Sequence, residues 1–162
     1  MKLLLYTSQA TPRVRYACKV LFRHILGLEV EVTADWFYFQ SANADKIIYG
    51  AAGSVGKEPC LPASSLLFEK DIHPQRVGIR HFEGRPAGFF VLGKAGALLP
   101  FDLLAFTFYL ATRYEEYLPF EGDDHGRFPA TGSQAHQHGF LQRPILQEWG
   151  AVLLKRLQAY YP

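Results

Sequence analysis

Cysteine is scarce in this sequence, with only Cys18 and Cys60 among its 162 residues. Two thiols so far apart make neither a disulfide framework nor a redox motif. Apolar runs long enough to cross a bilayer are also missing, so we expect no membrane span. The N-terminal stretch MKLLLY is too short for the apolar region of a signal peptide. These absences favour the cytoplasm, and they leave the localisation open.

An excess of one charge is lacking too, because 17 basic and 15 acidic residues leave a formal net charge of +2. That charge is too small to favour nucleic acid or an anionic membrane as a partner. The hydrophobic share of 49% and the charged share of 20% are typical of a soluble globular protein. The aromatic share of 15% is high, and it predicts either a core built on large rings or an aromatic surface that docks to a partner.

The N-terminal part of the sequence predicts a βαβ unit. Residues Lys2–Thr7 indicate a short buried strand, and Thr11, followed by proline, indicates a capped helix start. Gly27 is placed to end that helix, and residues 28–33 then alternate apolar and polar side chains like a half-exposed strand. Because strand, helix and strand in succession favour a parallel pair, we predict an α/β fold. We expect a mixed or mainly parallel sheet with packed helices, in a single domain spanning residues 1–162.

The remaining elements follow from hydrophobic periodicity and turn residues. Two helices are predicted: a largely buried one at Leu98–Leu118, whose start is marked by Pro100 and Asp102, and a second one at Pro144–Tyr160. The expected strands are residues 36–39, 46–49, 77–82 and 87–92, with a turn at residues 83–86 between the last two. Residues 50–65, rich in small residues and proline, indicate a loop.

Three basic residues of the first helix, Arg15, Lys19 and Arg23, recur on one helical face. The simplest interpretation of this basic stripe is a solvated surface. The alternative is a protein-interaction module, in which the basic stripe contacts a partner protein.

Three short patterns suggest chemistry but do not meet its requirements. GAAGSVGK, residues 50–57, lacks the glycine spacing and the final hydroxyl of a phosphate-binding loop, so a flexible loop is the better interpretation. Ser64 and Ser65 lack the glycine-flanked turn of a hydrolase nucleophile. His136 and His138 would lie on one side of an extended segment as half of a zinc site, but the spacing shows no third ligand. They are weak metal candidates, and two loop histidines are the preferred interpretation.

The stretch RYEEYLPFEGDDHGRFP, residues 113–129, combines charged and aromatic residues. Its candidate site residues are Arg113, Glu115, Glu116, Asp124, His125 and Arg127. One interpretation is a stand-alone enzyme or ligand-binding domain, in which Asp124 or Glu115 serves as acid/base and Arg127 holds an anion. The favoured interpretation is structural: a buried arginine–carboxylate network that locks the loop against the helix end, with Glu116 three residues after Arg113 and within pairing range.

Four segments in order carry a resemblance to a known domain: SSLLFEKDI, LPFDLLAFTFYLATRYEEYLPF, DDHGRFP and GFLQRPILQEW. Over essentially its whole length the chain resembles an N-terminal domain of unknown function in bacterial polysaccharide-deacetylase-family proteins. The most specific pieces are residues 113–118 and 125–128. Thr112 departs from the pattern, which has serine there.

The resemblance implies an accessory role. In that family an esterase domain holds a divalent metal through an aspartate and two histidines, and the metal activates water against an N-acetyl group. The signatures of that domain, a Thr-Phe-Asp-Asp-like strand and a His-x-x-x-His segment, do not occur here. We therefore expect no catalytic residue and no cofactor in this segment, with the metal in a catalytic domain that would begin near Pro162.

The expected function is that of a non-catalytic accessory domain of a polysaccharide deacetylase-like protein. The expected partner is a C-terminal deacetylase domain in the same chain, on which this domain would pack. A glycan that the domain helps to position is a possible second partner.

Overall fold

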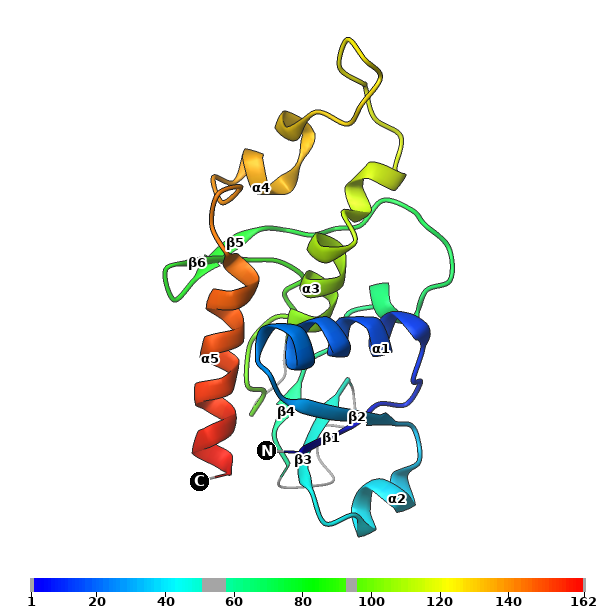
Figure 1. Ribbon diagram of the computed structural model, residues 1–162, viewed down its shortest axis with the longest axis vertical. Coiled ribbons are helices and arrows are strands. Elements are labelled where there is room, and N and C mark those ends of the chain that lie inside the picture. Colours follow the sequence, from blue (N-terminus) through cyan, green and yellow to red (C-terminus); the bar gives the residue numbers. More distant parts are fainter. Residues whose placement is uncertain (1, 51–57, 93–95, 162) are drawn as a thin grey trace.

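The structure is a computed structural model, and it describes residues 2–50, 58–92 and 96–161. Its centre is a parallel sheet of four strands in the order β2–β1–β3–β4 (Figure 1). These strands are β1 (Lys2–Tyr6), β2 (Glu29–Thr33), β3 (Asp45–Tyr49) and β4 (Cys60–Leu61). A small antiparallel sheet pairs β5 (Arg80–Phe82) with β6 (Arg85–Ala87). The predicted α/β fold with a mainly parallel sheet is confirmed.

The elements from β1 to β2 form the predicted βαβ unit. Helix α1 (Pro12–Cys18) begins as expected, because the Thr11 side chain accepts a hydrogen bond from the backbone N–H of Val14 at 3.2 Å. The helix continues as a π-helical segment, η1 (Lys19–Ile25). Gly27 has a φ of 66°, which glycine adopts without strain, and it lets the chain turn back into β2.

The two faces of the parallel sheet are covered differently. Because successive side chains of a strand point to opposite faces, Leu3 and Leu5 join the main core while Leu4 points the other way. The main core contains buried side chains of α1, of α3 (Leu103–Ala111) and of α5 (Ile145–Tyr160). On the opposite face Leu4 packs with Ile48 and with Phe39 of α2 (Trp36–Ser41), which lies below the sheet in Figure 1.

Helix α2 corrects the prediction of a strand at residues 36–39. The Asp35 carboxylate accepts a hydrogen bond from the backbone N–H of Tyr38 at 3.0 Å and so caps the helix. Trp36 and Phe39, three residues apart, then lie on one side of the helix and contact the ring of Tyr6 at 4.8 and 5.4 Å between centroids. The aromatic run forms a helix because this packing outweighs its preference for a strand.

The predicted buried helix at Leu98–Leu118 is too long at both ends. Asp102 is the N-cap of α3, and its carboxylate accepts from the backbone N–H of Ala105 at 2.9 Å. At the other end Arg113 has a φ of 54° and breaks the helix, and a 3₁₀ turn follows, η3 (Tyr114–Tyr117). The break brings the Tyr114 ring against Tyr109 at 5.4 Å, so tertiary packing ends the helix early.

The predicted strand at residues 77–82 is confirmed only at its end, as β5, and the predicted strand at 87–92 is wrong, because β6 lies mostly within the expected turn. Glu83 and Gly84, with φ of 48° and 73°, make a two-residue turn inside the expected four-residue one. Within the predicted loop at 50–65, β4 is a short strand, and residues 51–57, which hold most of GAAGSVGK, lie outside the described residues.

The predicted C-terminal helix is confirmed as α5. Trp149 of this helix is fully buried, and its indole N–H donates to the carbonyl of Pro86 at 2.8 Å, which fixes the helix to the hairpin. Cys18 of the first helix is a fully buried free thiol. None of the helices in the described ranges combines the length and apolarity needed to cross a membrane.

A buried carboxylate, that of Asp102, joins the sheet to α3. It accepts hydrogen bonds from the hydroxyl of Tyr49 at 2.8 Å and from the backbone N–H and hydroxyl of Ser64 at 2.6 and 2.8 Å. Tyr49 ends β3, and Ser64 follows β4. Burial raises the pKa of Asp102 from 3.8 to about 6, although the bonds from Ala105, Ser64 and Tyr49 act in the opposite direction.

Replacing Asp102 by alanine should destabilise the fold, because it leaves the Tyr49 hydroxyl and the Ser64 N–H without their acceptor. Each unsatisfied buried donor costs roughly 1–3 kcal/mol, so we expect the free energy of unfolding to fall by roughly 3 kcal/mol. Urea denaturation measures the change. The matched control is Asp124→Ala at an exposed position, which should have almost no effect, and equal small effects at both positions would contradict this role.

The raised pKa also predicts a pH dependence of stability. The folded state binds the Asp102 proton more tightly than the unfolded chain, so the contribution is complete below pH 3.8 and is lost as the pH rises through about 6. The variant Asp102→Asn cannot ionise. The difference in unfolding free energy between wild type and this variant should therefore shrink by about 3 kcal/mol over that interval, measured by urea denaturation at each pH. A difference that stays constant over this interval would show that folding does not raise the pKa of Asp102.

Candidate functional site

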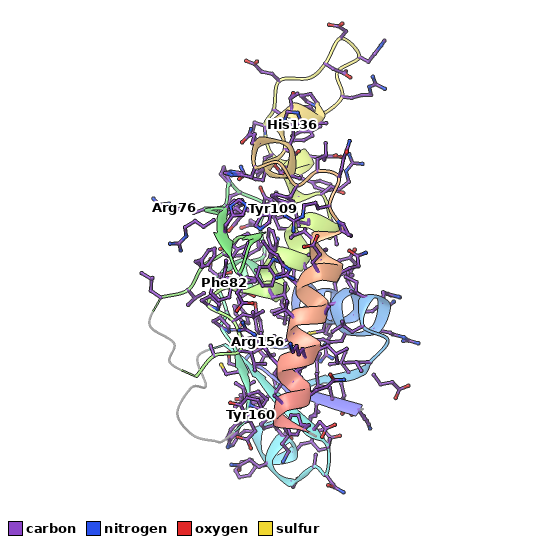
Figure 2. The ribbon with its side chains drawn as sticks, turned by 90° about the vertical axis from the view of Figure 1, so that its left-hand side faces the viewer. Arg76, Phe82, Tyr109, His136, Arg156 and Tyr160 are labelled. Carbon is purple, nitrogen blue, oxygen red and sulfur yellow. The ribbon has the colours of Figure 1, made fainter. Side chains whose placement is uncertain are left out.

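A long loop, residues 118–133, projects beyond the body of the fold, and we call it the arm. It runs from η3 to α4 (Gln134–Gln137), includes the 3₁₀ turn η4 (Ala130–Gly132), and forms the yellow extension at the top of Figure 1. Figure 2 shows side chains spreading from the tip of the arm in several directions, with His136 labelled below the tip. The candidate site residues predicted at positions 113–127 lie in the arm or at its start.

Arg113 is the residue at which the chain leaves α3 and turns towards the arm. A φ of 54° is rare for a residue with a side chain, and glycine usually takes this place after a helix. The Arg113 guanidinium pairs with the carboxylate of Glu116, which confirms the predicted pairing. The next residue, Tyr114, is buried, and its hydroxyl accepts from the N–H of His73 at 3.1 Å and donates to the His73 carbonyl at 3.2 Å. The base of the arm is thus fixed to the body.

The tip of the arm is organised by Asp123. Its carboxylate accepts from the backbone N–H groups of His125 and Arg127, both at 2.9 Å, and from the Arg127 Nε at 3.0 Å. The bonds from the Arg127 backbone and side chain hold the pKa of Asp123 below its usual value. Gly122 is required in this turn because a Cβ there would lie 2.8 Å from the Cα of Gly126.

The prediction of a buried network is wrong in two respects: the charged groups are exposed, and the aspartate that pairs with Arg127 is not the predicted one. Arg127 is 72% exposed in its side chain and pairs with Asp123 rather than Asp124. Asp124 and His125 are exposed at the tip. The arm extends away from the hydrophobic core, so its charged groups stay in water, where they need no buried network.

Beneath the arm lies a hollow of about 620 Å³, which we call the arm hollow. Two aromatic residues of the arm, Phe120 and Phe128, line it with their rings edge to face at 5.1 Å. Phe120 is 42% exposed. The polar lining includes Glu115, Glu121 and Asp123. Large rings held at the surface beside carboxylates provide both an apolar face and hydrogen-bond acceptors.

Two smaller hollows adjoin the arm hollow and share Phe128 as a wall. One, of about 260 Å³, is lined by Arg113, Glu115 and Glu116 among others. The other, of about 490 Å³, is lined by Arg113, Glu116, Asp123 and Arg127. Together the three hollows surround the base of the arm with ionised side chains of both signs.

Glu115 is a half-buried carboxylate at the base of the arm. It lines the arm hollow and the 260 Å³ hollow, and it accepts a hydrogen bond from the backbone N–H of Gln134 at 2.7 Å. Burial raises its pKa above the usual value, the Gln134 bond acts against this, and neighbouring Glu116 adds to it. Such a carboxylate can accept a hydrogen bond from a ligand hydroxyl or exchange a proton with it.

The predicted site residues are only partly brought together. Glu115 and Arg127 line adjacent hollows, whereas Asp124 and His125 line none of the hollows around the arm described above. The extended segment predicted for His136 and His138 is instead helix α4 with its C-cap, which turns the two imidazoles to different sides. Within the described residues, no group of three or more His, Cys, Asp or Glu side chains is placed to hold a metal ion.

Asp123, Phe120 and Phe128 are the residues of the site that sequence reasoning missed. The signal for Asp123 was its place between Gly122 and Arg127 in GDDHGR, where an aspartate commonly bonds backbone N–H groups two residues on. The aromatic pair carried no signal, because the same residue type fills the core.

Fold and site together define a single α/β domain with a projecting polar and aromatic arm. The chain matches the group described as "Family of unknown function (DUF7033)" over residues 3–162, and it belongs to this family. Neither the curated proteins nor the solved structures contain a match to the chain.

Replacing Arg127 by alanine tests whether its exposed pair with Asp123 contributes to the stability of the fold. The exposed pair with Asp123 contributes little to stability, so the melting temperature should fall by no more than about 3 °C. Differential scanning calorimetry measures this, with Asp102→Ala as the variant that must show a much larger fall. A fall in melting temperature as large as that of Asp102→Ala would show that Arg127 belongs to a network that stabilises the fold.

Proposed function

We propose that this domain is a non-catalytic accessory domain of a polysaccharide deacetylase-like protein and that it helps to position a glycan in the arm hollow. The observation that carries the proposal is the pairing of partly exposed Phe120 and Phe128 with carboxylates in one solvent-open hollow. The apolar face of a sugar ring packs on an aromatic ring, and its hydroxyls donate to carboxylates. The arm hollow offers both kinds of contact.

The resemblance of the sequence to deacetylase-associated domains supports the same proposal. Its most specific pieces, residues 113–118 and 125–128, are the start and the far side of the arm, and they supply Glu115 and Phe128 to the arm hollow. Apart from Tyr114, which is buried in the core, these residues are exposed or half-buried. A pattern placed at a projecting surface favours recognition over packing as its purpose.

Arg113 adds a physical argument for function at the base of the arm. A left-handed backbone costs a residue with a side chain roughly 1–2 kcal/mol, and glycine avoids this cost. The exposed pair with Glu116 returns little of it. The side chain lines two of the three hollows, so a ligand contact gives a reason for arginine at this position.

The alternative of a stand-alone enzyme has one observation in its favour, the raised pKa of Glu115 in a hollow. A general acid needs such a shift. Incubating this domain alone with an N-acetylglucosamine oligomer and measuring released acetate and shortened products separates the two ideas. Turnover that Glu115→Gln abolishes would replace the accessory role with catalysis.

We expect Phe128→Ala to weaken binding of an N-acetylglucosamine tetramer about tenfold, because one sugar ring loses its stacking partner. Isothermal titration calorimetry measures the affinity. The matched control is Phe37→Ala, since Phe37 is 84% exposed on α2 and should not matter. Absence of binding by the wild type, or equal losses in both variants, would count against the proposal.

Arg113→Gly should keep or raise the melting temperature and still weaken binding of the same tetramer. The substitution removes backbone strain but also removes a guanidinium that faces the hollows. Calorimetric melting and titration are measured on the same sample. A melting temperature lowered by several degrees would show that Arg113 serves the fold and not a ligand.

A further inference from the structure

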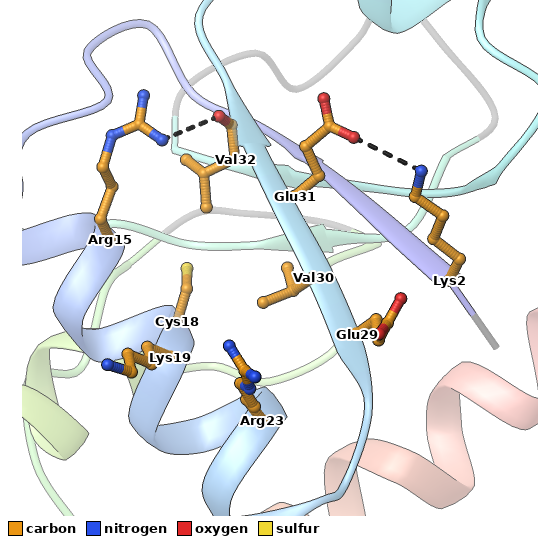
Figure 3. Close-up of a pocket in the computed structure, with 9 residues that line it drawn as sticks. All are labelled: Lys2, Arg15, Cys18, Lys19, Arg23, Glu29, Val30, Glu31 and Val32. Carbon is orange, nitrogen blue, oxygen red and sulfur yellow. Dashed lines mark hydrogen bonds and ion pairs between the residues drawn. The ribbon is translucent and has the colours of Figure 1, made fainter.

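A second surface, apart from the arm, lies between the first helix and strand β2. It is a groove of about 450 Å³, which we call the edge groove. Figure 3 shows the basic stripe of the helix, Arg15, Lys19 and Arg23, on one side and residues 29–32 of β2 on the other. The groove follows the strand lengthwise, as an extended peptide would.

Strand β2 is the edge of the parallel sheet, and within the described ranges β1 is its only partner strand. The carbonyl of Thr33 faces inward and accepts from the N–H of Thr7 at 3.0 Å. The carbonyl of Val32 faces outward, because it accepts from the Arg15 side chain at 3.2 Å. Backbone groups alternate along a strand, so those of Val30 and Val32 face the edge groove and form a template for another strand.

The outward edge is only lightly protected. Proteins usually shield such an edge with charged side chains, proline, a bulge or a covering element, and of these β2 carries the charged side chains of Glu29 and Glu31. Here the exposed Arg15 side chain supplies one hydrogen bond to it, and β2 itself contains no proline. An incoming strand can replace that single bond with several backbone bonds, and Arg15 then becomes available to a side chain of that strand.

The basic residues on the helix side of the edge groove determine which sequence an added strand can have. Arg15, Lys19 and Arg23 are all exposed, and among the described residues none of them forms an ion pair. A strand added to β2 turns every second side chain towards the helix. On its other face it would meet Glu29 and Glu31, where carboxylates are disfavoured. The complementary sequence therefore alternates acidic and neutral residues.

We propose that the edge groove binds an extended acidic segment of a partner protein, which adds to β2 as a further strand and directs alternate carboxylates to Arg15, Lys19 and Arg23. Backbone hydrogen bonds to Val30 and Val32 supply affinity, and the three basic side chains supply selection. This surface is independent of the proposed glycan function at the arm.

A second copy of this chain fits the groove less well. Pairing β2 with another β2 would set Glu29 and Glu31 against the same residues of the copy and would bring two basic stripes together. Like charges across an interface are unfavourable, so the occupant has a sequence different from that of β2.

The experiment uses a fluorescein-labelled peptide of alternating Glu and Thr, with binding followed by fluorescence anisotropy at low salt. The whole chain should bind it, and a Lys–Thr peptide should not bind. Only every second peptide N–H can face β2, so of two peptides N-methylated at all Glu or at all Thr positions, one should keep its affinity. The other should lose at least about tenfold in affinity. Equal binding of both methylated peptides and the parent would overturn strand addition.

Two chain variants complete the test. Charge reversal of Arg15, Lys19 and Arg23 to glutamate should weaken binding by at least about tenfold. Reversal of Lys70 and Arg76, which are exposed outside the edge groove, should leave it unchanged. Val30→Pro removes an outward N–H without touching the ladder to β1, so it should block binding, whereas Val30→Ala loses the same packing on the core but keeps that N–H and should still bind. Binding that survives the basic-stripe reversal, no binding by wild type, or a dimer in sedimentation that Val30→Pro abolishes would each overturn the proposal.

Discussion

The buried carboxylate of Asp102 is the contact on which the positions of the other elements depend. It caps α3, holds the tyrosine that ends β3, and holds the serine that follows β4. The C-terminal ends of two parallel strands are thereby joined to the start of the central helix. The direction of α3 then determines where the chain reaches Arg113 and where the arm begins, so a group deep in the core places a surface site at the far end of the helix. Four donors directed at this carboxylate offset part of the cost of burying it.

The fold was largely readable from the sequence because its first elements are local and regular. The Thr11 cap, the apolar stripe of the first helix and Gly27 are short-range signals, and the structure follows them. The predictions were wrong where contacts between residues distant in the sequence determine the local structure. Residues 36–39 have strand-like composition, yet the Asp35 cap and contacts with Tyr6 make them helical. The early end of α3 at Arg113 depends on the bonds of Tyr114 to His73, which no local pattern reveals.

The candidate site was readable in composition but not in geometry. The pairing of Arg113 with Glu116 follows from their spacing, and the structure contains it. Whether the charged stretch at 113–129 is buried depends on the path of the arm, and the chain carries it outward. The aspartate that pairs with Arg127 also differs from the predicted one. Asp123 accepts the hydrogen bonds of Arg127, whereas Asp124 is exposed to solvent. The sequence pattern does not distinguish Phe120 and Phe128 from core rings, because both sets have the same residue type.

The two surfaces of the domain suit different kinds of ligand. The arm hollow combines rings and carboxylates, as a sugar requires, and the edge groove combines backbone groups and cations, as an acidic strand requires. The most direct test of glycan positioning is an NMR titration of the ¹⁵N-labelled chain with the N-acetylglucosamine tetramer. We expect saturable shifts in the backbone amides around Glu115, Phe120 and Phe128, with β2 unaffected. Unchanged amides around the arm hollow, or shifts confined to other parts of the molecule, would contradict the proposed function.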